Sequence, residues 1–379
     1  MKIVAIAGSH IPSDTANSIQ VMKACSALAQ LRHDLTLLVP DFDLRPFDGA
    51  QGKPSTFNIQ SHYGIPNIFP IEWLSGSSRR LFTFNSVRRA LAHKPDLLYV
   101  WMPQSAVFGL LARVPTVFEA HLQPTGRFGP AWHRAFARLP GRKRLACITF
   151  ALKRTLEDDY HMRMRARDVV IAPNGVELER FASQPDPEPA RRLIGLREAP
   201  TVLCAGHLYA GRGADLFLDL AKWTPQASFV WVGGRQADVE EWRGKAAGLS
   251  NVTFVGFVPN RDLPDYLAAA DVLLMPYARS ILGSSGDASS AAVASPMKMF
   301  EYMAAGRAIL TSDLPVIREV LDEHNAVFCP PEDIRAWRAA LTDLLADSRL
   351  RAALATQARR EVEQYTWLAR AQNILAGLK

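Results

Sequence analysis

The feature that most constrains the fold is a strand–helix alternation that runs through the chain twice. In the first half, short apolar runs such as Ile3–Ala7 and Thr116–Ala120 alternate with helical stripes. The alternation restarts at Val202–Ala205, after the Pro-rich connector Gln184–Pro189. Buried strands that alternate with helices are typical of a parallel sheet covered on both faces. The sequence therefore predicts two α/β domains in tandem, and 379 residues are enough for two cores.

Further expectations concern particular parts of the chain. Residues Pro40–Gly76 are rich in Pro and Gly and are expected to be irregular. A short helix is expected at Val316–Leu321, and the chain is expected to end in a run of helices whose last member spans Trp367–Leu378. In parallel sheets ligands bind at the carboxyl ends of the strands, so we expect two facing domains to form a cleft.

Composition narrows the class of protein. A hydrophobic content of 48% and a charged content of 21% are those of a soluble globular protein. Met1-Lys2 leads into only five apolar residues, and no apolar run approaches the ~20 residues of a membrane span, so a cytoplasmic location is expected. The four cysteines are far apart in apolar runs and are interpreted as buried thiols, with neither disulfides nor zinc: Cys25, Cys147, Cys204 and Cys329.

Charge is concentrated in the first half. Up to Arg180 there are 23 Lys and Arg against 14 Asp and Glu, a net charge of +9, whereas the remainder has a net charge of −2. Such a basic half could contact an anionic membrane surface or an acidic acceptor. Nucleic acid is not expected as a partner, because no interleaved aromatic residues or DNA-reading motif accompany the charge. The alternative interpretation is a set of dispersed, solvated charges.

The stretch Ser295–Gly306 predicts a ligand site. A Gly/Ser/Ala-rich loop ends at Ser295, a good N-cap, Pro296 suits the first helical position, and Gly306 is a typical helix stop. A loop that leads into a helix N-terminus can bind an anion, because backbone N–H groups and the helix dipole meet there. Lys298 adds a cation in the first turn, and Glu301 one turn later could accept hydrogen bonds from the hydroxyls of a sugar.

Four short motifs together resemble one enzyme family. They are Ser13-Asp14-Thr15-Ala16-Asn17-Ser18, Pro173-Asn174-Gly175-Val176, Gly206-His207-Leu208-Tyr209 with Gly211-Arg212-Gly213, and Ser295 to Gly306. With them the chain resembles the GT4-type retaining glycosyltransferases of the GT-B fold over nearly its whole length. Each motif alone is weakly specific, and the resemblance is strongest in the second half, where the spacing of three motifs agrees.

The resemblance implies that different parts of the chain bind the acceptor and the nucleotide sugar. Residues 1–180 would form a Rossmann-like acceptor-binding domain, residues 181–365 a Rossmann-like nucleotide-sugar-binding domain, and residues 366–379 a helix that packs back toward the first domain. The family's Arg and Lys that grip the diphosphate fall on His207 and Arg212. The implied donor-binding residues are Asn174, Gly206, His207, Ser295, Pro296, Met297 and Glu301.

The resemblance also departs from the family pattern. Glu301 matches the second of two glutamates, which binds the nucleotide ribose, but the first position is occupied by Val293. Asp287 or a backbone amide near Ala294 and Ser295 could replace that first glutamate. Ser-Pro and Lys before the glutamate match a recurring branch of the family.

The first half supplies the other implied site residues. His121 closes the strand Thr116–Ala120 and matches a histidine that the family presents to the donor sugar, with Glu119 two residues earlier. Ser13 and Asn17, in the loop Gly8–Ser18, and Glu119 are the expected acceptor contacts. The paired glycines usual in that loop are missing.

Two other motifs are interpreted as non-functional. Asp41-Phe42-Asp43 spells the metal-binding Asp-x-Asp of the other glycosyltransferase fold, but it is interpreted as a polar turn after a strand. The Gly206–Gly213 stretch matches neither a dinucleotide fingerprint nor a P-loop by spacing. We expect no cofactor and no metal.

The expected reaction is transfer of a sugar from a UDP- or GDP-sugar to an acceptor hydroxyl with retention of configuration. The acceptor would be a glycan or a lipid-linked saccharide in polysaccharide or glycolipid assembly. Arg212, Lys298 and His121 are the expected catalytic residues. The alternatives are a catalytically silent partner subunit that binds nucleotide and a nucleotide-sugar hydrolase or epimerase.

Overall fold

The computed structural model describes residues 1–41, 58–75, 78–281 and 292–378. It divides the chain into two compact units. Unit 1 comprises Met1–Asn174 and Trp367–Lys379, and unit 2 comprises Gly175–Thr366. The sequence analysis placed the corresponding boundaries at residues 180 and 365.

Unit 1 is built on a seven-stranded sheet in the order β3-β2-β1-β4-β5-β6-β7. All neighbouring strands pair in parallel. The strands are β1 (Lys2–Ile6), β2 (Asp34–Asp41), β3 (Ile71–Ser75), β4 (Leu97–Val100), β5 (Thr116–Ala120), β6 (Lys143–Cys147) and β7 (Val169–Ile171). Its helices are α1 (Ala16–Gln30), α2 (Ile59–Tyr63), α3 (Arg79–Ala92), α4 (Pro103–Leu111), α5 (Gly129–Arg138), α6 (Phe150–Asp158) and α14 (Trp367–Leu375).

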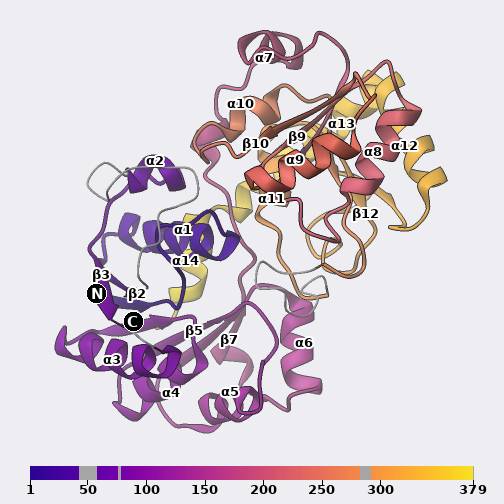
Figure 1. The fold of residues 1–379 in the computed structure, drawn as a ribbon. Helices are drawn as coiled ribbons and strands as arrows, with labels where there is room; N and C mark the ends of the chain where they lie inside the picture. Colours follow the sequence, from indigo (N-terminus) through magenta and orange to yellow (C-terminus); the bar gives the residue numbers. More distant parts are fainter. Residues whose placement is uncertain (42–57, 76–77, 282–291, 379) are drawn as a thin grey trace. The chain divides into compact units, whose positions relative to one another are not determined.

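The last helix of the chain belongs to unit 1. α14 packs against α1, and Figure 1 shows these two helices side by side although the whole of unit 2 separates them in the sequence. They cover one face of the sheet, while α3 and α4 lie on the other face. β1 and β4 are completely buried apart from Lys2, as expected for strands covered on both faces.

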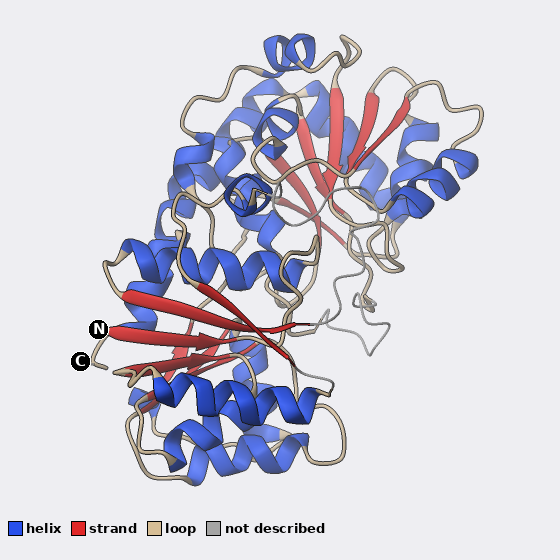
Figure 2. Ribbon diagram, turned by 60° about the vertical axis from the view of Figure 1, so that its left-hand side comes forward, coloured by secondary structure: helices blue, strands red, loops and turns tan. Residues whose placement is uncertain are grey.

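Unit 2 repeats the architecture with a six-stranded parallel sheet in the order β10-β9-β8-β11-β12-β13. The strands are β8 (Thr201–Ala205), β9 (Ser228–Val232), β10 (Val252–Gly256), β11 (Val272–Met275), β12 (Ala308–Ser312) and β13 (Val327–Cys329). The helices are α7 (Pro187–Leu193), α8 (Ala214–Trp223), α9 (Gln236–Lys245), α10 (Leu263–Ala268), α11 (Met297–Ala305), α12 (Ile334–Ala346) and α13 (Ser348–Glu361). Figure 2 shows helices on both faces of each sheet. The predicted pair of doubly wound parallel sheets is confirmed.

Several local predictions differ from the structure. The stretch expected to be irregular contains α2 and β3, and α7 begins within the Pro-rich connector, with Pro187 as its first residue. The helix expected at Val316–Leu321 is wrong, because residues 315–320 form successive turns. The apolar side chains of this segment are buried, as they would be in a helix. The segment is too short, however, for its apolar spacing to distinguish a helix from a series of turns.

Candidate functional site

Both sheets reverse their strand order once, and several residues of interest lie in the loops that follow the strands at these points. The order reverses between β1 and β4 in unit 1 and between β8 and β11 in unit 2. At such a point the loops that leave two neighbouring strands run in opposite directions and leave space for a ligand at the carboxyl edge. The Gly206–Gly213 loop follows β8, and Tyr277 follows β11.

Two cations converge on one tyrosine ring in unit 2. The guanidinium carbon of Arg212 lies 5.1 Å and the Lys298 Nζ 5.0 Å from the centre of the Tyr277 ring. Arg212 also donates a hydrogen bond of 2.8 Å to the Tyr277 hydroxyl. Lys298 is only 8% exposed. Within the described residues its ammonium contacts this ring and the Cys204 thiol, 3.9 Å away, but no carboxylate. A nearly buried ammonium that meets no carboxylate among the described residues is an arrangement that favours binding of an anion.

Glycines allow this close approach. A Cβ on Gly206 would lie 3.2 Å from the Lys298 Nζ, and a Cβ on Gly213 would lie 2.0 Å from the Pro276 carbonyl oxygen. Gly206 and Gly213 have φ values of 131° and 85°, which side chains disfavour. The loop after β8 therefore needs glycine at both positions to reach the end of β11 and the first turn of α11.

The start of α11 lies one residue later than predicted. The helix begins at Met297, and Pro296 rather than Ser295 is the N-cap, with extended φ and ψ of −67° and 123°. The side chain of Pro296 itself makes no capping hydrogen bond. The proline ring fixes φ at this value and makes Pro296 a suitable entry to the helix. Gly306 ends the helix in the left-handed conformation, as predicted. The positive end of the α11 dipole thus coincides with Lys298.

Glu301, one turn further along α11, is held by a partner that the sequence did not reveal. Arg180 places its Nη1 3.7 Å from Glu301 Oε1 and 3.4 Å from Glu177 Oε2, and its Nη2 donates to the Asn260 carbonyl. Glu301 is 8% exposed, so its rotamer is restricted by packing as well as by this charge. The structure places Glu301 and Lys298 on the same short helix.

His207 lies in an aromatic stack and not beside the Tyr277 ring that Arg212 and Lys298 contact. Its imidazole stacks on the Tyr209 ring, with the ring centres 4.9 Å apart and an angle of 8° between the planes. The guanidinium carbon of Arg235 lies 5.8 Å from the centre of the Tyr209 ring. Arg212, by contrast, lies on Tyr277. The two residues expected to grip a diphosphate therefore lie in the same loop but contact different aromatic rings, Tyr209 for His207 and Tyr277 for Arg212.

In unit 1 a buried carboxylate holds His121. Glu119, on β5, is 1% exposed, and His121 Nε2 lies 2.7 Å from its Oε1. Arg370 of α14 binds both oxygens, with Nη2 2.7 Å from Oε1 and Nη1 3.1 Å from Oε2. Tyr99 of β4 and Gln20 of α1 donate the remaining hydrogen bonds. We call these five residues the Glu119 cluster. Glu119 accepts all of these hydrogen bonds and its side chain is enclosed within unit 1. The expected contact of Glu119 with an acceptor stays a prediction.

The Glu119 cluster fixes the protonation of its carboxylate. Burial alone would raise the pKa of Glu119, but the Arg370 charge and the hydrogen bonds from His121 and Arg370 outweigh it and hold that pKa well below its usual value. Burial and the nearby Glu119 charge raise the pKa of Tyr99 well above its usual value, so its hydroxyl stays protonated and donates. Because an ionised carboxylate only accepts, His121 must donate from Nε2, and its Nδ1 is left for another partner.

The loop that follows β1 contains the expected acceptor contacts. Ser13 donates its backbone N–H to the Tyr63 hydroxyl at 2.7 Å, and its carbonyl lies 3.1 Å from His62 Nε2. Thr15 caps α1 by accepting from the Ser18 N–H at 3.3 Å, and Asn17 is exposed on the first turn. Two consecutive residues of α2 therefore hold Ser13 in place.

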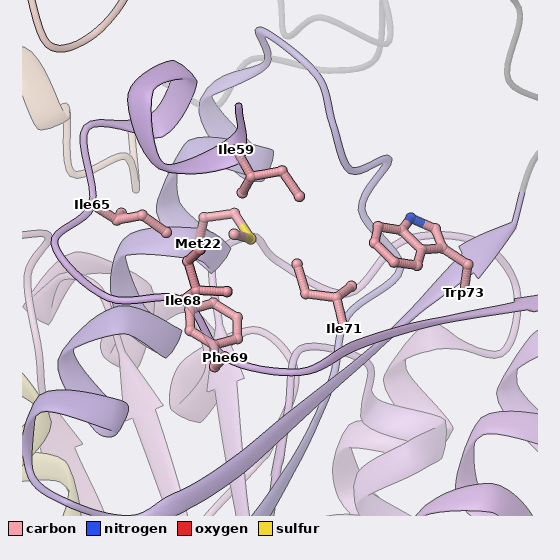
Figure 3. A pocket seen from close by; sticks show the side chains of 7 residues that line it. All are labelled: Met22, Ile59, Ile65, Ile68, Phe69, Ile71 and Trp73. Atoms are coloured by element: carbon pink, nitrogen blue, oxygen red, sulfur yellow. The ribbon is translucent and has the colours of Figure 1, made fainter. Parts of the chain in front are cut away.

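An apolar pocket of about 160 Å³ lies beside this loop. Figure 3 shows its lining residues: Met22, Ile59, Ile65, Ile68, Phe69, Ile71 and Trp73. Ile68 and Trp73 are 74% and 41% exposed, which is high for side chains of their size. Trp73 also donates from Nε1 to the Ile11 carbonyl at 2.9 Å, so the pocket wall and the loop after β1 are joined directly.

Family comparisons agree with this architecture in both units. Residues 18–180 match the model described as Glycosyltransferase Family 4, and residues 199–347 match the one described as Glycosyl transferases group 1. Both halves of the chain are glycosyltransferase domains.

Comparisons with individual proteins agree with the family comparisons. The glycosyltransferase is 28% identical over 314 residues to phosphatidyl-myo-inositol mannosyltransferase of Mycolicibacterium smegmatis, which covers 79% of this chain and 75% of the relative. It is 27% identical to D-inositol 3-phosphate glycosyltransferase of Jonesia denitrificans over 55% of this chain and 50% of that one. Its fold superposes on Anabaena Alr3699/HepE with a TM-score of 0.72, at 18% identity, over 100% and 99% of the two chains. The fold is therefore GT-B.

The described part of the glycosyltransferase contains no group of three or more His, Cys, Asp or Glu side chains placed to hold a metal ion. No described helix combines the length and apolar character needed to cross a bilayer. The four cysteines are buried and free, as predicted. Asp287 lies outside the described residues, as do Phe42 and Asp43 of the Asp41-Phe42-Asp43 motif. Val293 is buried. Asn174, also buried, is the last residue of the first segment of unit 1.

Sequence analysis missed Tyr277, Arg180, Arg370, Tyr99 and Gln20. Tyr277 carried a usable signal, since it lies two residues beyond the carboxyl end of the buried strand β11. Arg370 carried a second one, because it lies three residues after Trp367 and four before Ile374, on the apolar stripe of a helix. A charge on a buried stripe needs a partner. The identity of that partner, 251 residues away, had no local signal.

Proposed function

We propose that this glycosyltransferase transfers a sugar from a UDP- or GDP-sugar to an acceptor hydroxyl with retention of configuration and without a metal. The observation that carries the proposal is the pair of cations on Tyr277. Arg212 and the nearly buried Lys298 meet at the strand-order reversal of unit 2 and at the N-terminus of α11. The expected ligand there is the diphosphate of the donor, and Glu301 would bind its ribose. Anabaena Alr3699/HepE, which shares the fold, has been crystallised with UDP and with UDP-glucose.

In the proposed reaction the bond between the anomeric carbon and the diphosphate oxygen breaks, and the acceptor oxygen bonds to the same face of that carbon. The acceptor proton passes to the departing phosphate oxygen, so no protein carboxylate is needed as base. Negative charge develops on the leaving group, and fixed donors lower the barrier by stabilising that charge more than they stabilise the substrate. Arg212, Lys298 and the α11 dipole would supply these donors. Ser295, Pro296 and Met297 would line the approach, with Gly206 admitting the phosphates.

Removal of one cation tests the donor site. We expect Arg212→Ala to lower turnover by about 100-fold or more, as for loss of one preorganised donor in other enzymes. The matched control is Arg192→Ala on α7, which removes a half-exposed arginine paired with Glu188. Thermal shifts with UDP, GDP and their sugar conjugates give the binding readout, because a ligand that binds only the folded state raises Tm. A normal rate in Arg212→Ala would refute the assignment, and nucleotide binding without turnover would indicate a silent subunit.

We further propose that the acceptor carries an apolar group, such as the lipid of a lipid-linked saccharide. The apolar pocket beside Ser13 supports this, since Trp73 and Tyr63 connect its surroundings to the loop expected to bind the acceptor. The name of the M. smegmatis relative contains the name of a lipid, phosphatidyl-myo-inositol. We expect Ile68→Asp to raise the KM for a lipid-linked acceptor while leaving KM for a short water-soluble analogue unchanged. Equal effects on both acceptors would contradict the proposal.

The basic first half would hold the enzyme on an anionic membrane, the proposed location of such an acceptor. Co-sedimentation with vesicles that contain anionic lipid should be strong at low salt and weak at high salt, because exposed charges are screened. Neutral vesicles are the control. Equal recovery with neutral and anionic vesicles would remove this part of the proposal.

A further inference from the structure

We propose that Arg370 is a positioning residue for His121, acting through Glu119, so that the last helix of the chain completes the site of unit 1. Arg370 is 6% exposed and His121 has a side chain that is 24% exposed. The buried end of the cluster thus belongs to α14, and the accessible end lies just beyond the carboxyl end of β5. The inference rests on the proposed function only for the statement that His121 contacts the donor sugar.

The hydrogen bonds of Arg370 fix its guanidinium in one orientation. Besides its two bonds to Glu119, it donates from Nε to the Pro173 carbonyl at 2.8 Å and to the Ala172 carbonyl at 3.2 Å. These carbonyls follow β7, whereas Glu119 is in β5. The planar guanidinium of Arg370 thus donates from all three of its nitrogens, which leaves the Glu119 carboxylate little freedom to rotate. Lysine has neither the fork nor the number of donors to do the same.

Glu119 passes this constraint to His121. Its Oε1 accepts from Arg370, Gln20 and His121, and its Oε2 accepts from Arg370 and Tyr99. Gln20 is itself fixed, since its Oε1 accepts from the Trp101 Nε1 at 3.1 Å. Because its other acceptor positions are taken by Arg370, Gln20 and Tyr99, the carboxylate accepts from His121 in one direction and selects the ring form with the proton on Nε2. A hydrogen-bonded partner that fixes the tautomer of a histidine is a recurrent way to orient it.

The first test follows the tautomer of His121 directly. The ¹⁵N shifts of the imidazole report which nitrogen carries the proton, and His121→Gln identifies the signals among the nine histidines. We expect an Nε2-protonated ring in the full-length protein. We expect Arg370→Lys to mix the two tautomers, because the carboxylate regains freedom. The double variant Glu119→Gln/Arg370→Met should do the same without leaving a buried charge unpaired.

The second test measures turnover. In Arg370→Lys we expect kcat to fall about 10- to 100-fold, the usual range for loss of an outer partner, with an unchanged KM for the nucleotide sugar. The matched control is Arg144→Gln, which removes another bond to the end of the same segment, from Nη2 to the Ala376 carbonyl at 2.7 Å, and leaves Glu119 untouched. The control should retain both the kcat and the His121 spectrum of the unmodified protein.

The outcomes separate the inference from the proposed function. Unchanged His121 shifts in both Arg370→Lys and the double variant would overturn the inference. Equal losses of kcat in Arg370→Lys and Arg144→Gln would also overturn it, because docking of the segment alone would then explain the effect. If the unmodified protein transfers no sugar, the proposed function fails, while the tautomer experiment still decides the inference.

Discussion

At the scale of single residues, Tyr277 explains how two like charges can share a small space without an anion. Its ring faces both cations, and the negative face of an aromatic ring partly offsets their repulsion. Its hydroxyl also accepts a hydrogen bond from Arg212. The Arg212 Nε is buried and makes no hydrogen bond within the described residues, so the guanidinium has capacity for a further acceptor. Tyr277 therefore holds Arg212 in place, and an N–H group of Arg212 still has no hydrogen-bond acceptor among the described residues.

Loss of the Tyr277 hydroxyl tests this arrangement. We expect Tyr277→Phe to lower kcat about tenfold, because Arg212 loses its anchor but keeps the ring, and tenfold corresponds to about 1.4 kcal/mol. Tyr277→Leu removes the ring as well and should cost about 100-fold. Steady-state kinetics with the preferred nucleotide sugar give the measurement, and Tyr266→Phe on α10 is the control. A larger loss in Tyr277→Phe than in Tyr277→Leu would contradict the explanation.

The Glu119 cluster predicts a particular loss of stability in acid. The pKa of Glu119 is lowered on folding, so its contribution is fully present above the unfolded pKa of about 4.3 and is lost as pH falls toward the folded pKa. Below pH ~4 one such group makes the unfolding free energy fall by up to about 1.4 kcal/mol per pH unit. Urea titrations between pH 5 and 3 should therefore show a steeper decline for the unmodified protein than for Glu119→Gln/Arg370→Met. Parallel declines would show that the carboxylate is not ionised in the folded protein.

At the scale of elements, the loop between β8 and α8 depends on glycine for its path. Gly213 lies before α8 with φ of 85°, and a Cβ there would meet the Pro276 backbone. We expect Gly213→Ala to reduce the unfolding free energy by about 2 kcal/mol or more, from left-handed strain and the clash. Gly244→Ala is the matched control, since Gly244 lies in α9 with open space around its Cα and should gain about 0.5–1 kcal/mol. Urea unfolding of both variants is the measurement, and equal effects would contradict the argument.

Elements with strong local signals were predictable, and elements that depend on context were not. β5 was predicted with its observed ends, Thr116 and Ala120, because it is an apolar run buried on both faces. β3 was missed because this edge strand is half-exposed and includes Glu72 and Ser75. α2 was missed because it has only five residues, too few for a helical stripe.

The site was predictable to the same extent. Lys298 is next to a helix start, and Arg212 lies in a glycine-rich loop. Both features are visible in a short window of sequence. Their meeting point on Tyr277 comes from strand order, since β8 and β11 are neighbours in space but not in sequence. The pairing of Glu119 with Arg370 likewise depends on where the last helix docks. Glu119 was expected to face an acceptor because its own neighbourhood gives no sign of five donors.

At the scale of the whole molecule, the chain leaves unit 1 at Asn174 and returns to it at Trp367. The returning segment brings large apolar side chains into the core of unit 1, and Trp367, Ile374 and Leu375 are all less than 7% exposed. At about 1.5–3 kcal/mol for each buried side chain, these three contribute an amount comparable to the entire stability of an average domain. The folding of unit 1 therefore depends on residues from the far end of the chain.

Deletion of residues 367–379 should then unfold unit 1 selectively. Besides its apolar side chains, the deletion removes Arg370, which would leave Glu119 as a buried charge without its cation, and breaking such a pair costs about 3–5 kcal/mol. Hydrogen exchange resolved by peptide should show lost protection in β1 and β5 and near-native protection in β8 and β11, because all four of these strands are core strands of their own units. A substitution of Trp367 by Ala should give a weaker version of the same pattern. Protection lost equally in both units would mean that they fold as one cooperative body, and native protection in β1 would mean that α14 is dispensable to the sheet it covers.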